Sequence, residues 1–281
     1  MPATLTPLRY PGGKTKNYDF VKTILDANDL HGTYIEPFAG GAGLAIKLLL
    51  HDDVQRIVIN DSDRAIYSFW KCVLEHTEDL CSFINTVPLT YDEWEKQRYI
   101  YMNNDKFDEL ELGKATFYLN RTNVSGVIKG GLIGGNNQTG NYKMDARFNR
   151  KNLIKKIQRI SLYKDRIDLY SYDVFELFGS GVLNKYRSSI INFDPPYVKK
   201  GSQLYMNYFT NEDHIRLRKI IGKLHRKWIV TYDDCILVED LYKNYRKSYI
   251  DIRYSIKESK RTNELVFFSN NLILPDSITL Y

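Results

Sequence analysis

Two periods of hydrophobic positions alternate along the chain. Short runs of apolar, β-branched residues predict buried strands, and longer stretches with apolar residues every three or four positions predict amphipathic helices. The predicted strands are residues 33–36, 56–60, 167–170, 189–193, 228–231, 249–252 and 265–269. The predicted helices are residues 43–50, 64–74, 152–162 and 212–224, the last with Thr210 as its N-cap. This alternation predicts an α/β fold with a largely parallel sheet covered by helices on both faces.

The alternation stops between about residues 88 and 150, where the sequence becomes polar and aromatic and then rich in glycine and asparagine. Residues 130–142 are typical of a hairpin or an exposed surface loop. We therefore expect one main domain formed by residues 1–87 and 151–281, with residues 88–150 inserted as a smaller lobe.

Composition limits the class of protein. A chain of 281 residues with 43% hydrophobic residues can bury a full α/β core and carry a second lobe. It has no apolar run long enough to span a membrane and begins without a basic-then-apolar leader, so we expect a soluble, cytoplasmic protein. Its three cysteines are an odd number without metal-like spacing, which predicts neither a disulfide framework nor a zinc site.

Charge and aromatic content change this picture only slightly. The net charge of +6 favours a polyanionic partner weakly. The 22 tyrosines, interspersed with lysine and arginine, suit a surface that stacks bases and binds phosphates, although many of these rings must belong to the core.

The first predicted strand leads into a glycine-rich turn. Gly40, Gly41 and Gly43 follow that strand and precede a helical run. Glycines at this position let the backbone pass close to a nucleotide-like ligand at the carboxyl end of the strand. The turn does not match the dinucleotide fingerprint, because Ile46 occupies the position of its third glycine.

An acidic residue ends the second predicted strand. Asp61 follows the glycine turn by about 20 residues, the spacing at which a carboxylate binds ribose hydroxyls. Asp63 is a second candidate. Either acid could instead cap the helix that begins near Arg64.

A Pro-Gly-Gly-Lys turn lies near the N-terminus. It is similar to the end of a phosphate-binding loop, but Leu8 stands where that loop requires glycine and no strand precedes it. These differences exclude a nucleoside triphosphatase of that type. A turn that presents Lys14 still suggests a site for an anion or a carboxylate, although many such turns are only surface features.

The most specific pattern is the sequence Ile-Ile-Asn-Phe-Asp-Pro-Pro-Tyr at residues 190–197. Here a buried strand ends in an acid, two prolines and an aromatic ring. The prolines remove two amide donors, so the carbonyl of Pro195 can point away from the sheet as an acceptor. Asp194 and that carbonyl could hold one amino group between them, while Tyr197 offers a flat face for an extruded base. The pattern predicts that Asp194, Pro195, Pro196 and Tyr197 are catalytic.

In the order of these motifs the chain resembles the Dam-like, or D12 class, DNA adenine methyltransferases of the alpha group. Residues 8–14 are similar to motif X, 36–43 to motif I, Asn60-Asp61 to the end of motif II and 194–197 to motif IV. Residues 119–127 resemble the stretch that leads into the family's target-recognition lobe, 172–175 the adenine-binding segment and 260–265 a late motif. Val124-Ser125-Gly126-Val127 departs from the aromatic-Asn/Ser-Gly-Leu sequence usual there.

This resemblance implies a seven-stranded, mostly parallel, Rossmann-like class I methyltransferase sheet with a helical and hairpin recognition lobe. It implies S-adenosylmethionine as methyl donor and no metal. Lys14 and the glycine turn would hold the methionine part, Asp61 the ribose, and Asp173 with Phe175 the adenine. The complete implied cofactor set is Tyr10, Gly12, Lys14, Glu36, Pro37, Phe38, Gly40, Gly41, Gly43, Asp61, Asp173, Phe175 and Asp194.

The implied substrate is adenine N6 in double-stranded DNA, flipped out of the duplex. Phosphate or base contacts from the lobe would come from Arg121, Asn123, Ser125, Lys129, Asn136, Asn137, Gln138, Lys143, Arg147, Arg150 and Lys151. We expect a monomer or weak dimer, acting as a solitary methylase or with a separate restriction endonuclease.

Two other interpretations remain open. The same chemistry could act on RNA adenine, cytosine or a glutamine side chain, although similar motifs in those enzymes usually begin with serine or asparagine and not with an acid such as Asp194. Alternatively, the chain could be a catalytically silent DNA-binding homologue, which the occupied catalytic positions disfavour.

Overall fold

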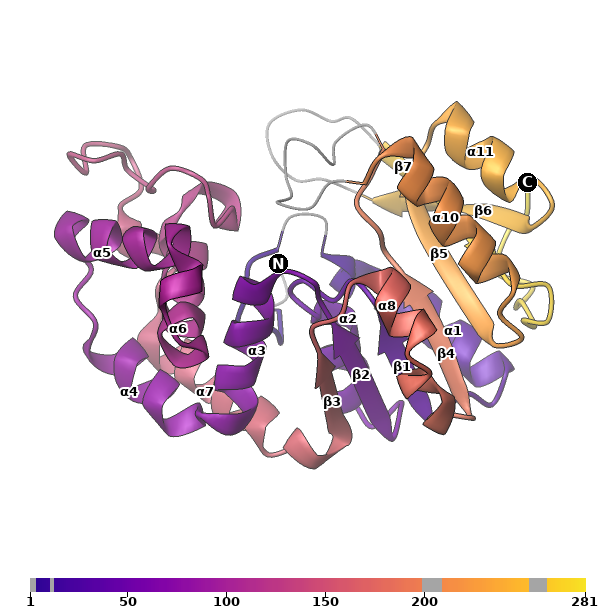
Figure 1. Ribbon diagram of the computed structural model, residues 1–281, viewed down its shortest axis with the longest axis horizontal. Helices are drawn as coiled ribbons and strands as arrows, with labels where there is room; N and C mark the ends of the chain where they lie inside the picture. The colour runs from indigo at the N-terminus through magenta and orange to yellow at the C-terminus, as the bar shows by residue number, and fades with distance from the viewer. Residues whose placement is uncertain (1–3, 11–12, 199–208, 253–261) are drawn as a thin grey trace.

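The computed structural model describes residues 4–10, 13–198, 209–252 and 262–281. These residues form a seven-stranded sheet with helices on both faces and a group of helices beyond one edge (Figure 1). The strand order is β3-β2-β1-β4-β5-β7-β6. The strands are β1 (Thr33–Glu36), β2 (Arg56–Asn60), β3 (Ile167–Tyr170), β4 (Ser189–Phe193), β5 (Lys227–Asp233), β6 (Arg246–Ile252) and β7 (Thr262–Phe268).

The first five strands are parallel, and β7 runs antiparallel to both β5 and β6. This architecture confirms the predicted mostly parallel α/β fold. Strands β1 to β4 have the predicted bounds. The last three strands differ because the antiparallel ladder also pairs polar residues: β6 begins at Arg246, three residues before its predicted start, and β7 begins at Thr262. Hydrogen bonds to the partner backbone do not require an apolar side chain.

Helices cover the two faces of the sheet with separate apolar clusters. Three helices pack on one face, namely α1 (Tyr18–Ala27), α2 (Gly43–Leu50) and α3 (Arg64–Glu75). Three others pack on the opposite face, namely α8 (Val174–Gly179), α10 (Asn211–Gly222) and α11 (Ile236–Tyr242). Thr210 caps α10 as predicted, and its side chain accepts a hydrogen bond from the backbone N–H of Asp213.

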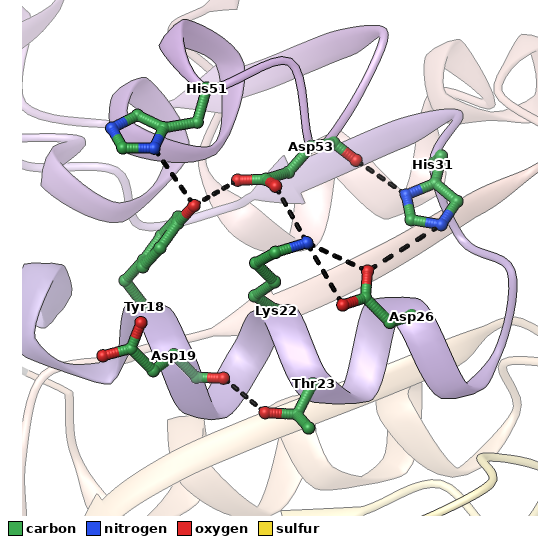
Figure 2. Close-up of polar contacts among 8 residues, drawn as sticks. All are labelled: Tyr18, Asp19, Lys22, Thr23, Asp26, His31, His51 and Asp53. Carbon is green, nitrogen blue, oxygen red and sulfur yellow. Dashed lines mark hydrogen bonds and ion pairs between the residues drawn. The ribbon is translucent and has the colours of Figure 1, made fainter.

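Helix α1 is anchored by polar contacts to the turn between α2 and β2 (Figure 2). Tyr18 donates a hydrogen bond of 2.6 Å to Oδ2 of Asp53, and Lys22 Nζ lies 3.0 Å from Oδ1 of the same carboxylate. Lys47 Nζ stacks 3.7 Å from the centroid of the Tyr18 ring. Because the short 3-10 helix η1 (Lys14–Asn17) leads directly into α1, this anchor also fixes the position of Lys14.

Beyond the β3 edge, helices gather into a lobe (Figure 1). Helix α6 packs closely on α3, because Gly113 has no side chain: a Cβ there would lie 2.4 Å from Cys72 Sγ. The helices α4 and α7, which flank residues 88–150, pack on each other beside this pair. The lobe helices are α4 (Thr77–Thr86), α5 (Tyr91–Met102), α6 (Glu109–Thr122) and α7 (Arg150–Ser161). The division into residues 1–87 with 151–281, and 88–150, stays a prediction.

Residues 130–142 form a series of turns and not a regular hairpin. One isolated antiparallel bridge joins Asn123 to Leu132. Of the two predicted alternatives, the structure therefore favours an exposed loop. Short 3-10 helices complete the described chain at η2 (Asn104–Lys106), η3 (Val124–Gly126), η4 (Met144–Arg147), η5 (Lys164–Arg166) and η6 (Val182–Lys185). No helix of the described residues has the length and hydrophobicity to cross a membrane.

Candidate active site

A cavity of about 710 Å³ opens at the carboxyl ends of β1, β2 and β4. This is the edge of a parallel sheet where α/β proteins bind ligands, and the volume suits a small molecule. Of the residues predicted from sequence, the cavity wall includes Tyr10, Lys14, Glu36, Phe38, Gly40, Gly41, Gly43, Asp61, Ser125, Asp173, Asp194 and Pro196. The predicted Gly12 and the start of the late motif, Lys260 and Arg261, lie outside the described residues. Pro37 is buried, and its carbonyl accepts a hydrogen bond from Asn60.

The glycine turn is shaped by contact with the N-terminal segment. Gly40 has a φ of +48°, and a Cβ on it would lie 2.6 Å from the ring of Tyr10. A Cβ on Gly43 would lie 2.3 Å from Thr15 Oγ1. The glycines therefore allow another part of the chain to lie against the turn, a role that the sequence pattern did not distinguish from close approach to a ligand.

The two candidate acids after β2 have different roles. Asp61 accepts hydrogen bonds from the backbone N–H of Gly40 at 2.8 Å and of Asp63 at 3.0 Å. Asp63 is the N-cap of α3 and accepts from Ala65 N–H at 2.8 Å. The helix-capping alternative thus applies to Asp63, while Asp61 lies at the glycine turn. Burial raises the pKa of Asp61 to about 7, and the nearby Asp63 carboxylate contributes to that rise.

Two aromatic rings form part of the cavity wall. Phe38 and Phe209 line the cavity and contact each other edge to face, with ring centroids 5.7 Å apart. Phe175, predicted to contact adenine, stacks on Phe209 and supports that ring instead. Asp173 lines the cavity and caps α8 through Phe175 N–H at 2.8 Å. The sequence did not indicate Phe209, whose position immediately before the Thr210 cap belongs to no motif.

Two further acids belong to the cavity wall. Glu36 ends β1 and is only 6% exposed, and burial raises its pKa to about 8. Asp194 follows β4, and its Oδ1 accepts a hydrogen bond of 3.0 Å from Thr231 on β5. Burial raises the pKa of Asp194 to about 6 against the opposing effect of Lys14. Groups whose pKa lies near neutrality concentrate at functional sites.

Lys14 links the segment after β4, which is predicted to be catalytic, to strand β7. The family resemblance implies that Lys14 holds the methionine part of a cofactor, and this stays a prediction. In the structure Lys14 lines the cavity, and its ammonium lies 3.1 Å from Asp194 Oδ1 and 2.9 Å from Glu264 Oε2 and donates a hydrogen bond to the hydroxyl of Tyr197. Burial opposes its charge, but the Asp194 and Glu264 carboxylates outweigh that effect and raise the pKa of Lys14.

Tyr197 contacts the same group of charges. Its hydroxyl donates a short hydrogen bond to Glu264 Oε1, and Lys14 Nζ lies 4.9 Å from its ring centroid. Pro196 lines the cavity and Pro195 is buried. The four residues of the predicted catalytic segment therefore lie together at the end of β4, next to the cavity.

The predicted DNA-contacting residues separate into two groups. One group makes hydrogen bonds inside the protein. Gln138 donates to the Ile133 and Gly135 carbonyls, and Arg121 donates to the Arg147 carbonyl. Those exposed on the surface are Ser125, Lys129, Asn136, Asn137, Lys143, Arg147 and Lys151.

Asn123 also makes hydrogen bonds inside the protein, and it is fully buried. Its amide accepts from Trp94 Nε1 at 2.7 Å and donates to the carbonyls of Val127 and Ile128. The structure contradicts a direct DNA contact by Asn123, because this amide is already bonded inside the protein. Arg150, likewise, donates to the carbonyls of Ile84 and Val87.

A pair of reciprocal hydrogen bonds connects the lobe to the N-terminal segment. Asn120 on α6 accepts from Arg9 N–H at 2.8 Å and donates to the Arg9 carbonyl at 2.7 Å. Gly126 lies against the same residue with a φ of +77°, and a Cβ there would be 2.4 Å from the Arg9 carbonyl oxygen. The stretch similar to the entry of a recognition lobe therefore holds one wall of the cavity in place.

Comparison with known proteins identifies the family of this chain. The family described as D12 class N6 adenine-specific DNA methyltransferase matches residues 10–262. The type II methyltransferase M.MjaIII of Methanocaldococcus jannaschii is 27% identical over 78% of this chain and 80% of its own. The type II methyltransferase M.CviBI of Paramecium bursaria Chlorella virus NC1A is 24% identical over 89% and 91%. The retron Ec67 DNA adenine methylase of Escherichia coli is 24% identical over 94% and 91%. The match confirms the resemblance noted in the sequence, and the chain belongs to the D12 class of N6 adenine-specific DNA methyltransferases.

Proposed function

We propose that this protein transfers a methyl group from S-adenosylmethionine to N6 of adenine at a specific site in duplex DNA. The observation that carries the proposal is the position of Asp194, which follows β4 at the wall of a cavity whose other acids and rings match the cofactor's chemistry.

The cavity residues fit S-adenosylmethionine in charge and shape. The ligand carries a cationic ammonium, a cationic sulfonium, two ribose hydroxyls and a flat adenine. Glu36 and Asp61 offer carboxylates for the cationic and hydroxyl groups, and Phe38 with Phe209 offers a wall for the ring. We assign the cofactor to these residues and Asp173. Lys14 we assign to the catalytic side, since its ammonium is bonded to Asp194, Glu264 and Tyr197.

The chemistry of the target explains the catalytic segment. The bound cofactor supplies an electrophilic methyl group. The exocyclic nitrogen of adenine is a poor nucleophile because its lone pair is delocalised into the ring. Asp194 and the Pro195 carbonyl would accept its two hydrogens, favour a localised lone pair and stabilise the positive charge that develops on nitrogen. Tyr197 would stack on the flipped base and offset part of the cost of unstacking.

The lobe would supply the DNA contacts. Exposed Lys129, Lys143 and Arg147 suit phosphates, and exposed Asn136 and Asn137 suit base edges. The relatives' names include both type II methyltransferases and a retron methylase, so we propose a modification role, with or without a partner restriction endonuclease.

Transfer of tritium from labelled cofactor to duplex DNA, RNA and protein tests the substrate. We expect label in DNA adenine alone. Asp194→Ala should abolish the transfer, because the main acceptor is lost, while cofactor binding measured by calorimetry persists. Label in RNA or protein would contradict the proposed substrate, and absence of label in every substrate would favour a silent homologue. Single-molecule sequencing of DNA from expressing cells should then reveal one modified sequence.

A further inference from the structure

We propose that Glu264 is a positioning residue for methyl transfer, which holds Lys14 and Tyr197 in place and gives the acceptor site a net negative charge. This inference rests on the proposed function of Asp194. It assigns a role to Glu264, for which the sequence analysis predicted no role.

The contacts of Glu264 are buried and involve both carboxylate oxygens. Glu264 is 3% exposed, and Lys14 Nζ lies 3.0 Å from Oε1 and 2.9 Å from Oε2. Oε1 also accepts the hydrogen bond from Tyr197. Glu264 is held opposite Asp233 in the ladder between β5 and β7. One carboxylate on a rigid strand thus fixes the cation beside Asp194 and the ring that would stack on the base.

The charges of this group favour the proposed reaction. Lys14 and Asp194 alone would form a neutral pair, whereas Lys14 with Asp194 and Glu264 carries a net charge of −1 when all three are ionised. In the transfer, the N6–CH3 bond forms as the S–CH3 bond breaks with its electron pair left on sulfur. Positive charge therefore moves to N6 until a proton leaves to solvent. A fixed negative charge beside N6 stabilises that change.

The contacts of Asp194 suggest that its two carboxylate oxygens have different partners. Lys14 and Thr231 both contact Oδ1. We infer that Oδ2 receives the amino group, while Lys14 keeps the carboxylate ionised and oriented. Glu264 is needed because the neutral pair of Lys14 and Asp194 would leave no net negative charge to stabilise the positive charge that develops on the base.

Glu264→Gln tests this role with little change in shape. We expect kcat to fall about tenfold or more, with the KM values for DNA and cofactor within about twofold of wild type, since the loss affects the transition state. The acid limb of the kcat–pH profile should move to lower pH, because the Glu264 charge raises the pKa of Asp194. Glu239→Gln is the matched control: it removes the 2.6 Å ion pair between α11 and Lys247 on β6 and should change neither quantity.

An unchanged kcat, or an acid limb that does not move, would overturn the proposal. Should Glu264→Gln not fold, Glu264→Asp carries the test, because it keeps the charge but withdraws it from Tyr197, and a wild-type kcat there would count against positioning. Carboxyl carbon NMR of Asp194 separates this inference from the proposed function. If the wild-type protein transfers no methyl group, a lower pKa of Asp194 in Glu264→Gln still supports the coupling, and an unchanged pKa overturns it.

Discussion

Among single residues, Asp194 has neighbours with opposite effects on its pKa. Burial and Glu264 raise its pKa to about 6, whereas Lys14 and Thr231 favour the ionised form. Protonation turns one oxygen of a carboxyl group into a donor and leaves the group a weaker acceptor than the ionised carboxylate. The protonation state of this one group should therefore control the rate.

We expect kcat for methyl transfer to fall about tenfold per pH unit once the pH drops below the Asp194 pKa of about 6. Initial rates measured from pH 5 to 9 with saturating DNA and cofactor would check this. Circular dichroism at pH 5 controls for unfolding. A rate that stays constant down to pH 5 in the folded protein would contradict the assignment.

The buried Glu36 should lower the free energy of unfolding at high pH. Its folded pKa of about 8 lies above its ordinary value of 4.5, so its contribution to the free energy of unfolding is complete below pH 4.5 and is lost as the pH rises through 8. Glu36→Gln removes this loss. Relative to wild type, the free energy of unfolding of the variant should gain on the order of 5 kcal/mol between pH 4.5 and pH 9.

Urea unfolding of both proteins at the two pH values measures that gain. The variant should also bind cofactor more weakly, because Glu36 is proposed to face the cationic ligand. Equal stability differences at both pH values would show that burial does not disfavour the ionised form of Glu36.

At the scale of elements, the junction after α6 depends on one amide. Asn123 holds Trp94 and two carbonyls of the following turn. Asn123→Ala leaves these buried groups without that partner, and we expect a loss of about 2 kcal/mol in the free energy of unfolding. The exposed Asn136→Ala in the same lobe is the control and should change stability by less than about 0.5 kcal/mol. Chemical denaturation of the two variants measures both values, and equal effects would contradict the structural role of Asn123.

The central strands could be predicted because burial on both faces leaves a recognisable apolar run. All five residues of β4, Ser189–Phe193, are buried, and its predicted bounds agree with the structure. Helix α5 (Tyr91–Met102) gives no such pattern, since its buried residues include Gln97 and Tyr101 among charged neighbours. Its stability comes from packing on α6, which local sequence does not encode.

The positions of candidate site residues could be predicted where one short segment holds them together. The Asp194–Tyr197 segment and Asp61 each follow a strand, so their positions at the sheet edge could be inferred. The partnership between Lys14 and Glu264 could not, because 250 positions separate them and neither residue has a local signal for the other. Such pairs are set by the order of strands in the sheet.

At the scale of the whole molecule, charge on the lobe should govern DNA binding. Alanine at Lys129, Lys143 and Arg147 should flatten the plot of log binding constant against log salt concentration by about 0.9 for each phosphate that is no longer neutralised. Fluorescence anisotropy of a labelled duplex, titrated over a roughly sixfold range of salt concentration, would measure the slope.

The matched control replaces three exposed lysines on the opposite side of the molecule (Figure 1). Lys219, Lys223 and Lys243 lie on or just after α10 and α11. Removing them changes the net charge equally and should leave the slope unchanged. Equal flattening by both sets would mean that net charge, and not the lobe, determines the binding.

The strand order β5-β7-β6 has a consequence for the protein during its synthesis. Residues of β7 leave the ribosome after those of β6, yet they must enter between β5 and β6. Until then β5 has an unpaired edge, and Lys14 and Asp194 lack the acid that gives the group its net negative charge. A nascent chain that carries every other predicted catalytic residue should therefore be inactive and prone to wrong strand pairing. Translation of β7 would be the step at which methylation becomes possible.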